Sequence, residues 1–546
     1  MQNIKTVWAF SLLILSVSLL YGQFLWSPLV FDDPGFFYSS EFSHYQQLFS
    51  FDLRWLPYAT FVWTRNLFGD GIIWLRLGNL LLHLGVAISF FFFSKQLYAT
   101  LLPNESSENR LSQFWLAFFA ALLFALHPIA VYSVGYLIQR TTLMVTLFAL
   151  LTWKTFLTGL ITEKRSWLYL SALFYFFGAL SKEHAIMIPA VSLALYCLIE
   201  EQPLQRIKLI LPTFILYFLT ALFVVYQVKT RNILGQAYEP IASELMSRLG
   251  DLDKDLVYPL SVVTQTFIYF KYLWLWLIPN PMLMTVDMCQ AFTTRFTAFP
   301  QLLGLPLFIT YGIIAIRLLF KRGLIGLLGF ALLCPWLLFF TELATVRIQE
   351  IIVLYRSYLW MIGLFISLPF LCQKLTQKQA VLTLSGIALL FIPITYGRLT
   401  TFSHPLLLWD DAARQIKDAK TCPSMDRILN NRARHLMGIG RYQDAVNDLT
   451  RSFDVLKGKE KPMVSELANN FYNRGFAYLK LQQYQLALND FNIIVEPVPK
   501  HWADFYFFKA QAFEGLHDIN NAKLYYEKAC QMAIQESCEK QKALSQ

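Results

Sequence analysis

Long apolar runs, separated by short polar segments, occupy the chain from its N-terminus to about residue 400. An α-helix needs about 20 apolar residues to cross a hydrocarbon core roughly 30 Å thick. The pattern therefore predicts an all-α, polytopic membrane domain with about eleven spans. The predicted spans are residues 6–26, 77–94, 113–127, 141–160, 167–181, 185–200, 208–227, 298–317, 323–341, 351–372 and 380–396.

The distribution of basic residues predicts which side of the membrane each loop faces. Lys5 precedes the first run, and no small-residue cleavage site follows it, so we expect a retained helix with a cytoplasmic N-terminus. We expect the apolar segment 258–279 to lie along or dip into the outer interface, helped by Trp274 and Trp276. Alternate loops then carry the basic residues on the cytoplasmic side: Lys95, Lys164, Arg165, Arg206, Lys208, Arg317, Lys321, Arg322, Lys374 and Lys378. The C-terminus is expected outside, in the periplasm if the protein is bacterial.

The hydrophobic content and the net charge indicate whether the chain contacts lipid or nucleic acid. Hydrophobic residues make up 56% of the chain and charged residues 15%, on the membrane side of ordinary globular usage. The net charge of +10 is scattered over span ends, so it indicates positive-inside topology and contact with membrane lipid, with no nucleic acid partner. The seven cysteines show no metal-ligand spacing. A disulfide between Cys530 and Cys538 would need a break in the helix between them.

A soluble helical pattern with internal repeats begins near residue 425. The segment Gly440–Ala445 (GRYQDA) recurs at Gln482–Ala487 (QQYQLA) and more weakly at His517–Ala522 (HDINNA). The second interval is close to the ~34-residue period of tetratricopeptide repeats (TPRs). We therefore expect three domains: a membrane domain at 1–400, a linker and capping helix at 401–424, and a TPR-like α-solenoid at 425–546. The concave face of such a solenoid would bind a peptide or partner domain.

Two adjacent acids, Asp32 and Asp33, follow the first apolar run directly and belong to a predicted external loop at 27–76. Acids beside a bilayer are costly to bury, so a pair there points to a site that faces water at the membrane surface. The structural alternative is a helix N-cap with a loop acid. We favour the functional interpretation, a carboxylate base.

Other unusual polar residues also gather at or near the external ends of predicted spans. Each has a structural alternative, such as a hydrogen bond between helices, snorkelling, a tight turn or an ion pair. These candidates are Arg76, His83, His127, Arg140, Lys182, Glu183, His184, Arg347, Glu350 and Arg356. The short cytoplasmic loops offer no comparable group, so the external side is the expected site of chemistry.

Taken together, the pattern resembles the GT-C superfamily of membrane glycosyltransferases, and most closely the transmembrane-and-TPR (TMTC) O-mannosyltransferase group and its bacterial relatives. The motifs that carry the resemblance are the acid pair Asp32-Asp33, Asn79 with His83, Leu126-His127-Pro128 with Arg140, Ser181-Lys182-Glu183, the segment Pro279 to Asp287, and the terminal repeats. The segment after Glu350 matches the animal proteins only loosely, and three repeats are fewer than those proteins carry.

The resemblance implies transfer of a sugar from a polyprenyl-phosphate donor to a hydroxyl, usually of a protein, with inversion. A phosphate leaving group needs cations rather than a proton donor, and the acceptor hydroxyl needs a carboxylate base. Asp32 is the favoured base, and Asp33 would orient it or bind the acceptor. Arg140, Lys182 and Arg356 are the expected ligands of the donor phosphate.

The other candidates would position these groups: Arg76, His83, His127, Glu183, His184, Arg347 and Glu350. No metal ligand is assigned, and the need for a divalent cation stays open. The TPR-like domain would recruit the protein or peptide acceptor.

Two other functions fit parts of the sequence. A transporter or flippase of a lipid-linked substrate would place polar residues near mid-span, whereas most of them gather at external ends. A non-enzymatic, membrane-anchored TPR assembly protein would need only one span. The position of the polar residues and the number of predicted spans therefore both favour an enzyme that acts at the membrane surface.

Overall fold

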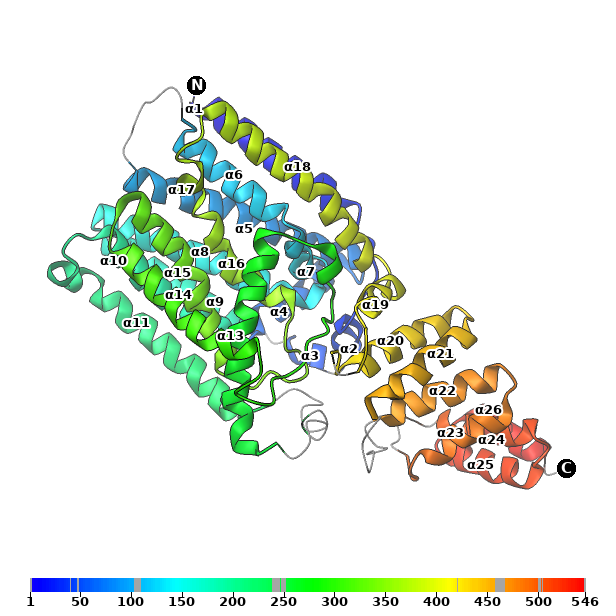
Figure 1. Cartoon of the computed structure of the whole chain (residues 1–546). Helices are drawn as coiled ribbons and strands as arrows, with labels where there is room; N and C mark the ends of the chain where they lie inside the picture. Colours follow the sequence, from blue (N-terminus) through cyan, green and yellow to red (C-terminus); the bar gives the residue numbers. More distant parts are fainter. Residues whose placement is uncertain are drawn as a thin grey trace. The chain divides into compact units, whose positions relative to one another are not determined.

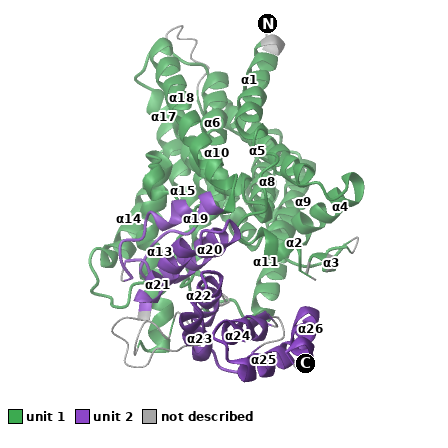
Figure 2. Cartoon of the chain, turned by 90° about the vertical axis from the view of Figure 1, so that its right-hand side faces the viewer, with its two compact units in different colours: residues 1–286, 292–405 green, residues 287–291, 406–546 purple. Residues whose placement is uncertain are grey.

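The computed structural model describes residues 2–39, 41–46, 49–102, 110–237, 246, 252–419, 421–456, 467–498, 502 and 504–544. Within these ranges the protein is all-helical, with 77% helix and no strand. The chain forms two compact units, coloured separately in Figure 2. Unit 1 comprises residues 1–286 and 292–405, and unit 2 comprises residues 287–291 and 406–546.

Unit 1 contains the long apolar runs of the chain. Its helices run from blue to yellow in Figure 1. Its α-helices are α1 (Gln2–Gly22), α2 (Asp33–Phe37), α3 (Glu41–His44), α4 (Trp55–Phe68), α5 (Ile72–Leu101), α6 (Gln113–Ala125), α7 (Val131–Val134), α8 (Arg140–Thr162), α9 (Arg165–Ser181), α10 (Ile188–Ile199), α11 (Pro203–Thr230), α13 (Lys254–Leu277), α14 (Gly304–Leu319), α15 (Gly323–Leu343), α16 (Ser357–Phe365), α17 (Leu368–Cys372) and α18 (Gln377–Phe402). Short 3-10 turns are η1 (Pro128–Ala130), η2 (Leu137–Gln139), η3 (Glu183–Met187), η4 (Pro281–Leu283), η5 (Gln301–Leu303) and η6 (Leu354–Arg356).

Seven helices of the described chain are long and apolar enough to cross a membrane, which indicates a multi-pass membrane protein. They are Lys5–Gly22, Ile72–Leu101, Leu137–Thr162, Pro203–Thr230, Gln301–Leu319, Gly323–Leu343 and Gln377–Phe402. An eighth candidate is the bent pair Gln113–Ala125 and Pro128–Val134, which meet at 51°. The predicted count of eleven is not confirmed. The predicted spans 167–181 and 185–200 form the shorter helices α9 and α10, and 351–372 is broken into η6, α16 and α17.

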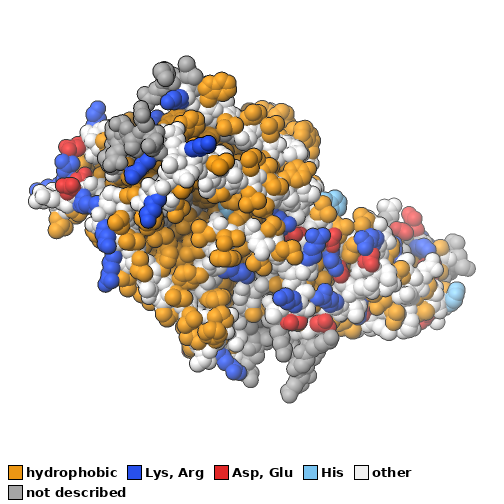
Figure 3. Space-filling view, turned by 45° about the horizontal axis from the view of Figure 1, so that its top comes forward, with side chains coloured by type: hydrophobic (Ala, Val, Ile, Leu, Met, Phe, Trp, Pro, Cys, Tyr) orange, Lys and Arg blue, Asp and Glu red, His pale blue; other side chains and the backbone are white. Residues whose placement is uncertain are grey.

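Burial separates the inner helices of unit 1 from the outer ones. The candidate spans in α5 and α8 are 56% and 67% buried by protein, whereas those in α1, α11, α14 and α18 are 22–28% buried. Figure 3 shows hydrophobic side chains spread widely over one face of the molecule. Because lipid tails are themselves apolar, exposed apolar surface on the outer helices suits contact with a bilayer. On the inside, Gly159 of α8 lets α9 approach closely, since a Cβ there would lie 2.6 Å from Leu168.

The segment expected along the outer interface is a continuous 24-residue helix, α13, which packs against α14 and α15. It is not among the seven described helices that are both long and apolar enough to cross a membrane. In Figure 1, α13 runs across the direction that α11 and α18 share. Trp274 is exposed, but Trp276 is buried and donates a hydrogen bond to Oγ of Ser357 at 2.9 Å. Only Trp274 of this pair therefore suits the interfacial role that we expected.

Unit 2 is an array of helices packed in consecutive pairs. They are α19 (Pro405–Ala413), α20 (Met425–Gly438), α21 (Tyr442–Ser452), α22 (Ala468–Lys480), α23 (Tyr484–Ile493), α24 (Asp504–Gly515), α25 (Ile519–Gln531) and α26 (Gln535–Ala543), with the 3-10 turn η7 (Phe453–Leu456). Small residues allow the close packing within and between pairs. A Cβ on Gly475 would lie 2.6 Å from Phe491, and one on Gly515 would lie 2.5 Å from Tyr484. The TPR identity of this array remains a prediction.

Two disulfides lie within unit 2, Cys289–Cys422 and Cys530–Cys538. The chain between α25 and α26 turns at Ala533, where φ is +70°, and this is the helix break that the second link requires. The sequence spacing gave no sign of the first link. Beside it, Arg427 forms an ion pair with the buried carboxylate of Asp287 at 2.7 Å.

Candidate functional site

The two adjacent acids occupy different environments. Phe31 has φ +55°, a left-handed conformation uncommon for a residue with a side chain, and the short helix α2 begins directly after this turn. Asp33 is completely buried and accepts hydrogen bonds from the backbone N–H groups of Leu137 at 3.3 Å and Ile138 at 3.1 Å. Asp32 is exposed, and its Oδ2 accepts a 2.7 Å hydrogen bond from the Tyr136 hydroxyl. Only Asp32 can meet a substrate.

Asp33 and Arg76 hold two loops together. Burial raises the pKa of Asp33 to about 7, although the charge of Arg76 and three backbone N–H donors oppose that rise. The Arg76 guanidinium donates to the carbonyl oxygens of Ser27 at 2.7 Å, Gly135 at 2.9 Å and Pro28. This pair is buried, so it fixes the backbone around the acid pair and does not reach an acceptor molecule.

Arg140, expected to bind the donor phosphate, is instead enclosed by protein. It donates to Asn79 Oδ1 at 2.8 Å, Thr60 Oγ1 at 3.0 Å and the Leu75 carbonyl at 2.6 Å. Gly78 makes room for it, since a Cβ there would lie 2.6 Å from the guanidinium. These contacts tie α8 to α4 and α5. They give Arg140 a structural role and do not support a phosphate contact.

His83 and His127 also connect helices. Nε2 of His83 lies 3.0 Å from the carbonyl oxygen of Ala125, and Nδ1 lies 2.7 Å from the hydroxyl of Tyr358. His127 contacts the carbonyl oxygen of Trp276 through Nε2 at 3.1 Å and stacks on its indole. Both rings are completely buried. The two rings therefore link α5, α6, α13 and α16, and the expected role in positioning the reacting groups stays a prediction.

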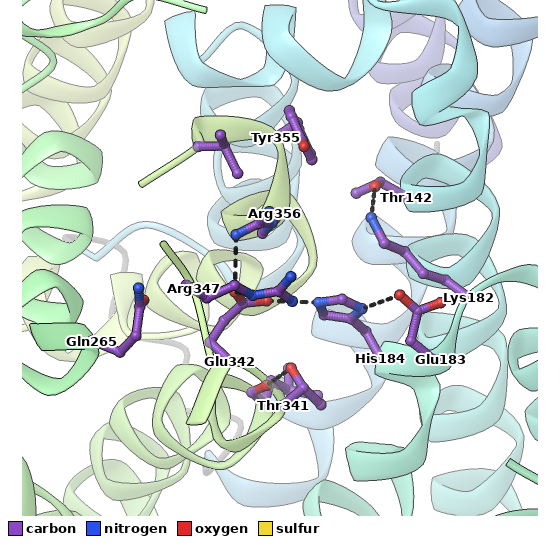
Figure 4. Close-up of polar contacts among 12 residues, drawn as sticks. Thr142, Lys182, Glu183, His184, Gln265, Thr341, Glu342, Arg347, Tyr355 and Arg356 are labelled. Carbon is purple, nitrogen blue, oxygen red and sulfur yellow. Dashed lines mark hydrogen bonds and ion pairs between the residues drawn. The ribbon is translucent and has the colours of Figure 1, made fainter. Parts of the chain in front are cut away.

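A second polar cluster centres on Glu342, in the last turn of α15 (Figure 4). Its carboxylate is 1% exposed and lies 2.7 Å from Nε2 of His184, 3.2 Å from Nε of Arg347 and 3.3 Å from Nη1 of Arg356. Glu342 stands at the end of an apolar run, so no motif in the sequence singled it out. A carboxylate at that position needs cationic partners from elsewhere in the fold. The presence of an acid there could therefore have identified Glu342 as a candidate.

The Glu342 cluster extends through Arg356 to Glu350. Nη2 of Arg356 donates to Glu350 Oε2 at 3.0 Å, and the Tyr355 hydroxyl donates to the same oxygen at 2.9 Å. The ammonium of Lys182 lies 5.6 Å from the centre of the Tyr355 ring and donates to Thr142 Oγ1 at 2.7 Å. Burial lowers the pKa of Lys182 to about 7, against the opposing charge of Glu183.

On the other side of His184, Glu183 pairs with Arg54. The Arg54 guanidinium makes a two-pronged contact, Nε to Oε2 at 3.0 Å and Nη2 to Oε1 at 2.5 Å. Burial would raise the pKa of Glu183, but Arg54 and His184 hold it well below its usual value. Arg54 has φ +65° at the start of α4, so the backbone bends at the residue that makes this contact. No motif in the sequence marked Arg54 as a site residue.

We name this set the Glu342 network: Arg54, Lys182, Glu183, His184, Glu342, Arg347, Glu350, Tyr355 and Arg356. It joins six of the predicted site residues, and aromatic contact connects it to the acid pair. The rings of Tyr136 and Tyr355 lie 5.8 Å apart, edge to face. A continuous path of polar and aromatic side chains therefore runs from Asp32 to Arg54.

A cavity of about 380 Å³ opens at one end of the Glu342 network. Its apolar wall comes mainly from the C-terminal end of α11 and the residues after it: Val224, Val225, Val228, Ile233 and Leu234. Its polar part contains Arg54, Glu183, His184, Arg231 and Arg347, and its aromatic part contains Phe36, Tyr45 and Tyr58. Arg231 also forms an ion pair with Asp52. The cavity thus combines three arginines with an aliphatic wall on one of the outer helices.

Comparison with known proteins adds no relative. No protein-family model matches the chain, and no curated protein matches it. Within the described residues, no three His, Cys, Asp or Glu side chains are grouped as metal ligands would be.

Proposed function

We propose that this protein is a GT-C-type membrane glycosyltransferase that moves a sugar from a polyprenyl-phosphate donor to a hydroxyl of a protein acceptor. The observation that carries the proposal is the cavity at the Glu342 network. It offers an aliphatic wall on an outer apolar helix and three arginines within one space. That combination suits a lipid whose chain stays in the bilayer and whose phosphate stops at the membrane surface.

Arginine is suited to the phosphate because its planar guanidinium presents several N–H donors in a fixed fork. Arg54, Arg231 and Arg347 line the cavity, and their carboxylate partners Glu183, Asp52 and Glu342 hold them in place. We assign the donor phosphate to these arginines in place of Arg140. Arg356 stands behind them in the network and adds positive charge, and Lys182 adds to it when protonated. Positive charge stabilises the phosphate as it leaves.

In the proposed reaction Asp32 is the base. Its carboxylate takes the proton of the acceptor hydroxyl while the acceptor oxygen forms a bond to the anomeric carbon of the sugar. The bond between that carbon and the phosphate oxygen breaks, and its electron pair leaves with the polyprenyl phosphate. Attack from the face opposite the phosphate inverts the anomeric centre. A phosphate stabilised by cations needs no protonation to leave, so one carboxylate is sufficient.

The disulfides support an external, oxidising location for unit 2. A disulfide joins residues on one side of a membrane, so Cys289 and Cys422 lie on the same side. The chain between them must then cross an even number of times. Three candidate spans lie there, in α14, α15 and α18, so the parity supports α16 and α17 as a fourth, broken crossing. With the bent pair and with α9 and α10, the proposed topology has about eleven spans.

Labelling can test this topology in sealed membranes. After reduction, a membrane-impermeant maleimide added from the outside should label the half-buried Cys289 and Cys530. If both react only when the reagent reaches the cytoplasmic side, the external placement is wrong.

Activity can be tested with the full-length chain in lipid nanodiscs. The probes are polyprenyl-phosphate mannose and polyprenyl-phosphate glucose as donors, with a mixture of serine- and threonine-containing peptides as acceptors. We expect a peptide mass gain of one hexose, and we expect Asp32→Asn to abolish it. Asp70→Asn is the matched control, since the Asp70 side chain is 90% exposed and lies 3.4 Å from Arg65.

Two results would contradict the proposal. One is the absence of transfer from both donors by the wild-type chain. The other is full activity in the Asp32→Asn variant. Movement of the lipid across the bilayer without a glycosylated product would instead support the flippase alternative.

A further inference from the structure

We infer that Tyr136 is a positioning residue that keeps the Asp32 carboxylate ionised and correctly oriented; this inference rests on the function proposed above. No spacing in the sequence marks Tyr136, since it lies in a stretch of small and apolar residues. The structure brings its hydroxyl to 2.7 Å from Oδ2 of Asp32, across 104 positions of the chain.

The phenol ring is fixed by its packing. Tyr136 is 1% exposed, and its ring contacts Phe31 at 5.4 Å and Tyr355 at 5.8 Å, edge to face in both cases. Phe31 is the residue whose left-handed backbone turns the chain into Asp32. The ring that holds the acid therefore also packs against the turn that presents it. A hydroxyl carried on such a ring has little freedom to leave Asp32.

The hydroxyl can act only as a donor toward an ionised carboxylate. Burial, together with the negative charge of Asp32, raises the pKa of Tyr136 well above its usual value, so the O–H is retained. A hydrogen bond donated to a carboxylate stabilises its charged form and lowers its pKa. The exposed acid consequently stays a base, while the buried Asp33 beside it keeps its proton more readily.

Other charged and titratable groups lie around Asp32 and must be considered in any pH profile. Asp33 follows it on α2, Arg76 approaches Asp33 from α5, and Tyr355 of η6 interacts with Asp32 electrostatically. Glu350 and Arg356 contact Tyr355 in turn. The Tyr136 hydroxyl donates to the Asp32 carboxylate at 2.7 Å, so removing that single oxygen should raise the pKa of Asp32.

The test is the pH dependence of hexose transfer by the full-length chain in nanodiscs, with the donors and peptides named above. Tyr136→Phe keeps the ring and removes the hydroxyl. We expect the midpoint of the acidic limb to move to higher pH by about one unit, with about a tenfold lower rate on that limb. The KM for the donor should not change, because Tyr136 does not line the cavity.

Tyr175→Phe is the matched control. Tyr175 is also completely buried, but it lies on α9 and packs against Tyr217 at 5.1 Å. Should Tyr136→Phe fold poorly, 3,5-difluorotyrosine incorporated at position 136 retains the ring and is a stronger donor. It should move the midpoint in the opposite direction, to lower pH.

The outcomes separate this inference from the proposed function. A wild-type chain without transferase activity overturns both. An active wild type with an unmoved midpoint in the position-136 variants overturns the positioning role alone. An equal shift in Tyr175→Phe has the same effect, because it would show that loss of any buried tyrosine hydroxyl alters the profile.

Discussion

Replacing Glu342 should strongly destabilise unit 1. Its carboxylate is 1% exposed and accepts contacts from His184 at 2.7 Å, Arg347 at 3.2 Å and Arg356 at 3.3 Å. Glu342→Ala removes the acceptor and leaves two buried guanidinium groups without that counter-charge. Removing one partner from a buried ionic group typically lowers the free energy of unfolding by about 3–5 kcal/mol, and we expect a loss in that range. Glu342→Gln keeps the volume and one acceptor oxygen, so its loss should be smaller, about 1.5–3 kcal/mol.

The unfolding of the purified protein can be followed with a thiol-reactive fluorophore. Cys334 is 1% exposed and lies on the same helix as Glu342, so its labelling reports the opening of this region. The control is Glu163→Gln. Glu163 pairs with Arg206 at 3.1 Å, but its side chain is 62% exposed. An exposed pair of this kind contributes about 0–1 kcal/mol.

The reasoning would be refuted if Glu342→Ala and Glu163→Gln unfolded with the same free energy. That result would mean that the buried arginines find equivalent acceptors without Glu342. A second check is the cavity. Because Glu342 holds Arg347 at the cavity wall, Glu342→Gln should also weaken the binding of polyprenyl monophosphate.

Two further predictions concern the cavity and the acid pair. Arg231→Gln should weaken the binding of polyprenyl monophosphate about tenfold or more, measured by native mass spectrometry, whereas Arg206→Gln at the other end of α11 should have no effect. The pKa of Asp33 is raised from 3.8 to about 7, so between these values the folded protein binds more protons than the unfolded chain. Its contribution therefore makes the free energy of unfolding fall as the pH rises through this window. Asp33→Asn should remove this decrease, measured as the thermal midpoint of unfolding against pH. An unchanged dependence of the midpoint on pH would contradict the raised pKa of Asp33.

The site could be predicted only in part. The sequence indicated the polar residues at the ends of apolar runs and the acid pair Asp32-Asp33, since polar groups next to apolar runs stand out. It could not separate Asp32 from Asp33, because the turn at Phe31 and the distant Tyr136 decide which acid is exposed. Arg140 looked as suitable for phosphate as Arg54 does in the structure. The difference between them is access: Arg140 is 2% exposed, whereas Arg54 lines the cavity.

The amino-acid order alone determined that the chain is helical and built for a bilayer. Within lipid every backbone N–H and C=O must be satisfied inside its own segment, so long apolar runs have few alternatives to helices. The tertiary structure decided which polar groups meet. Helices that are apolar all round carry no stripe that marks their inner face, so neighbours are chosen by close packing at residues such as Gly78 and Gly159. Those choices placed Glu342 against His184, Arg347 and Arg356 and enclosed Arg140, and neither outcome follows from the order of residues along one helix.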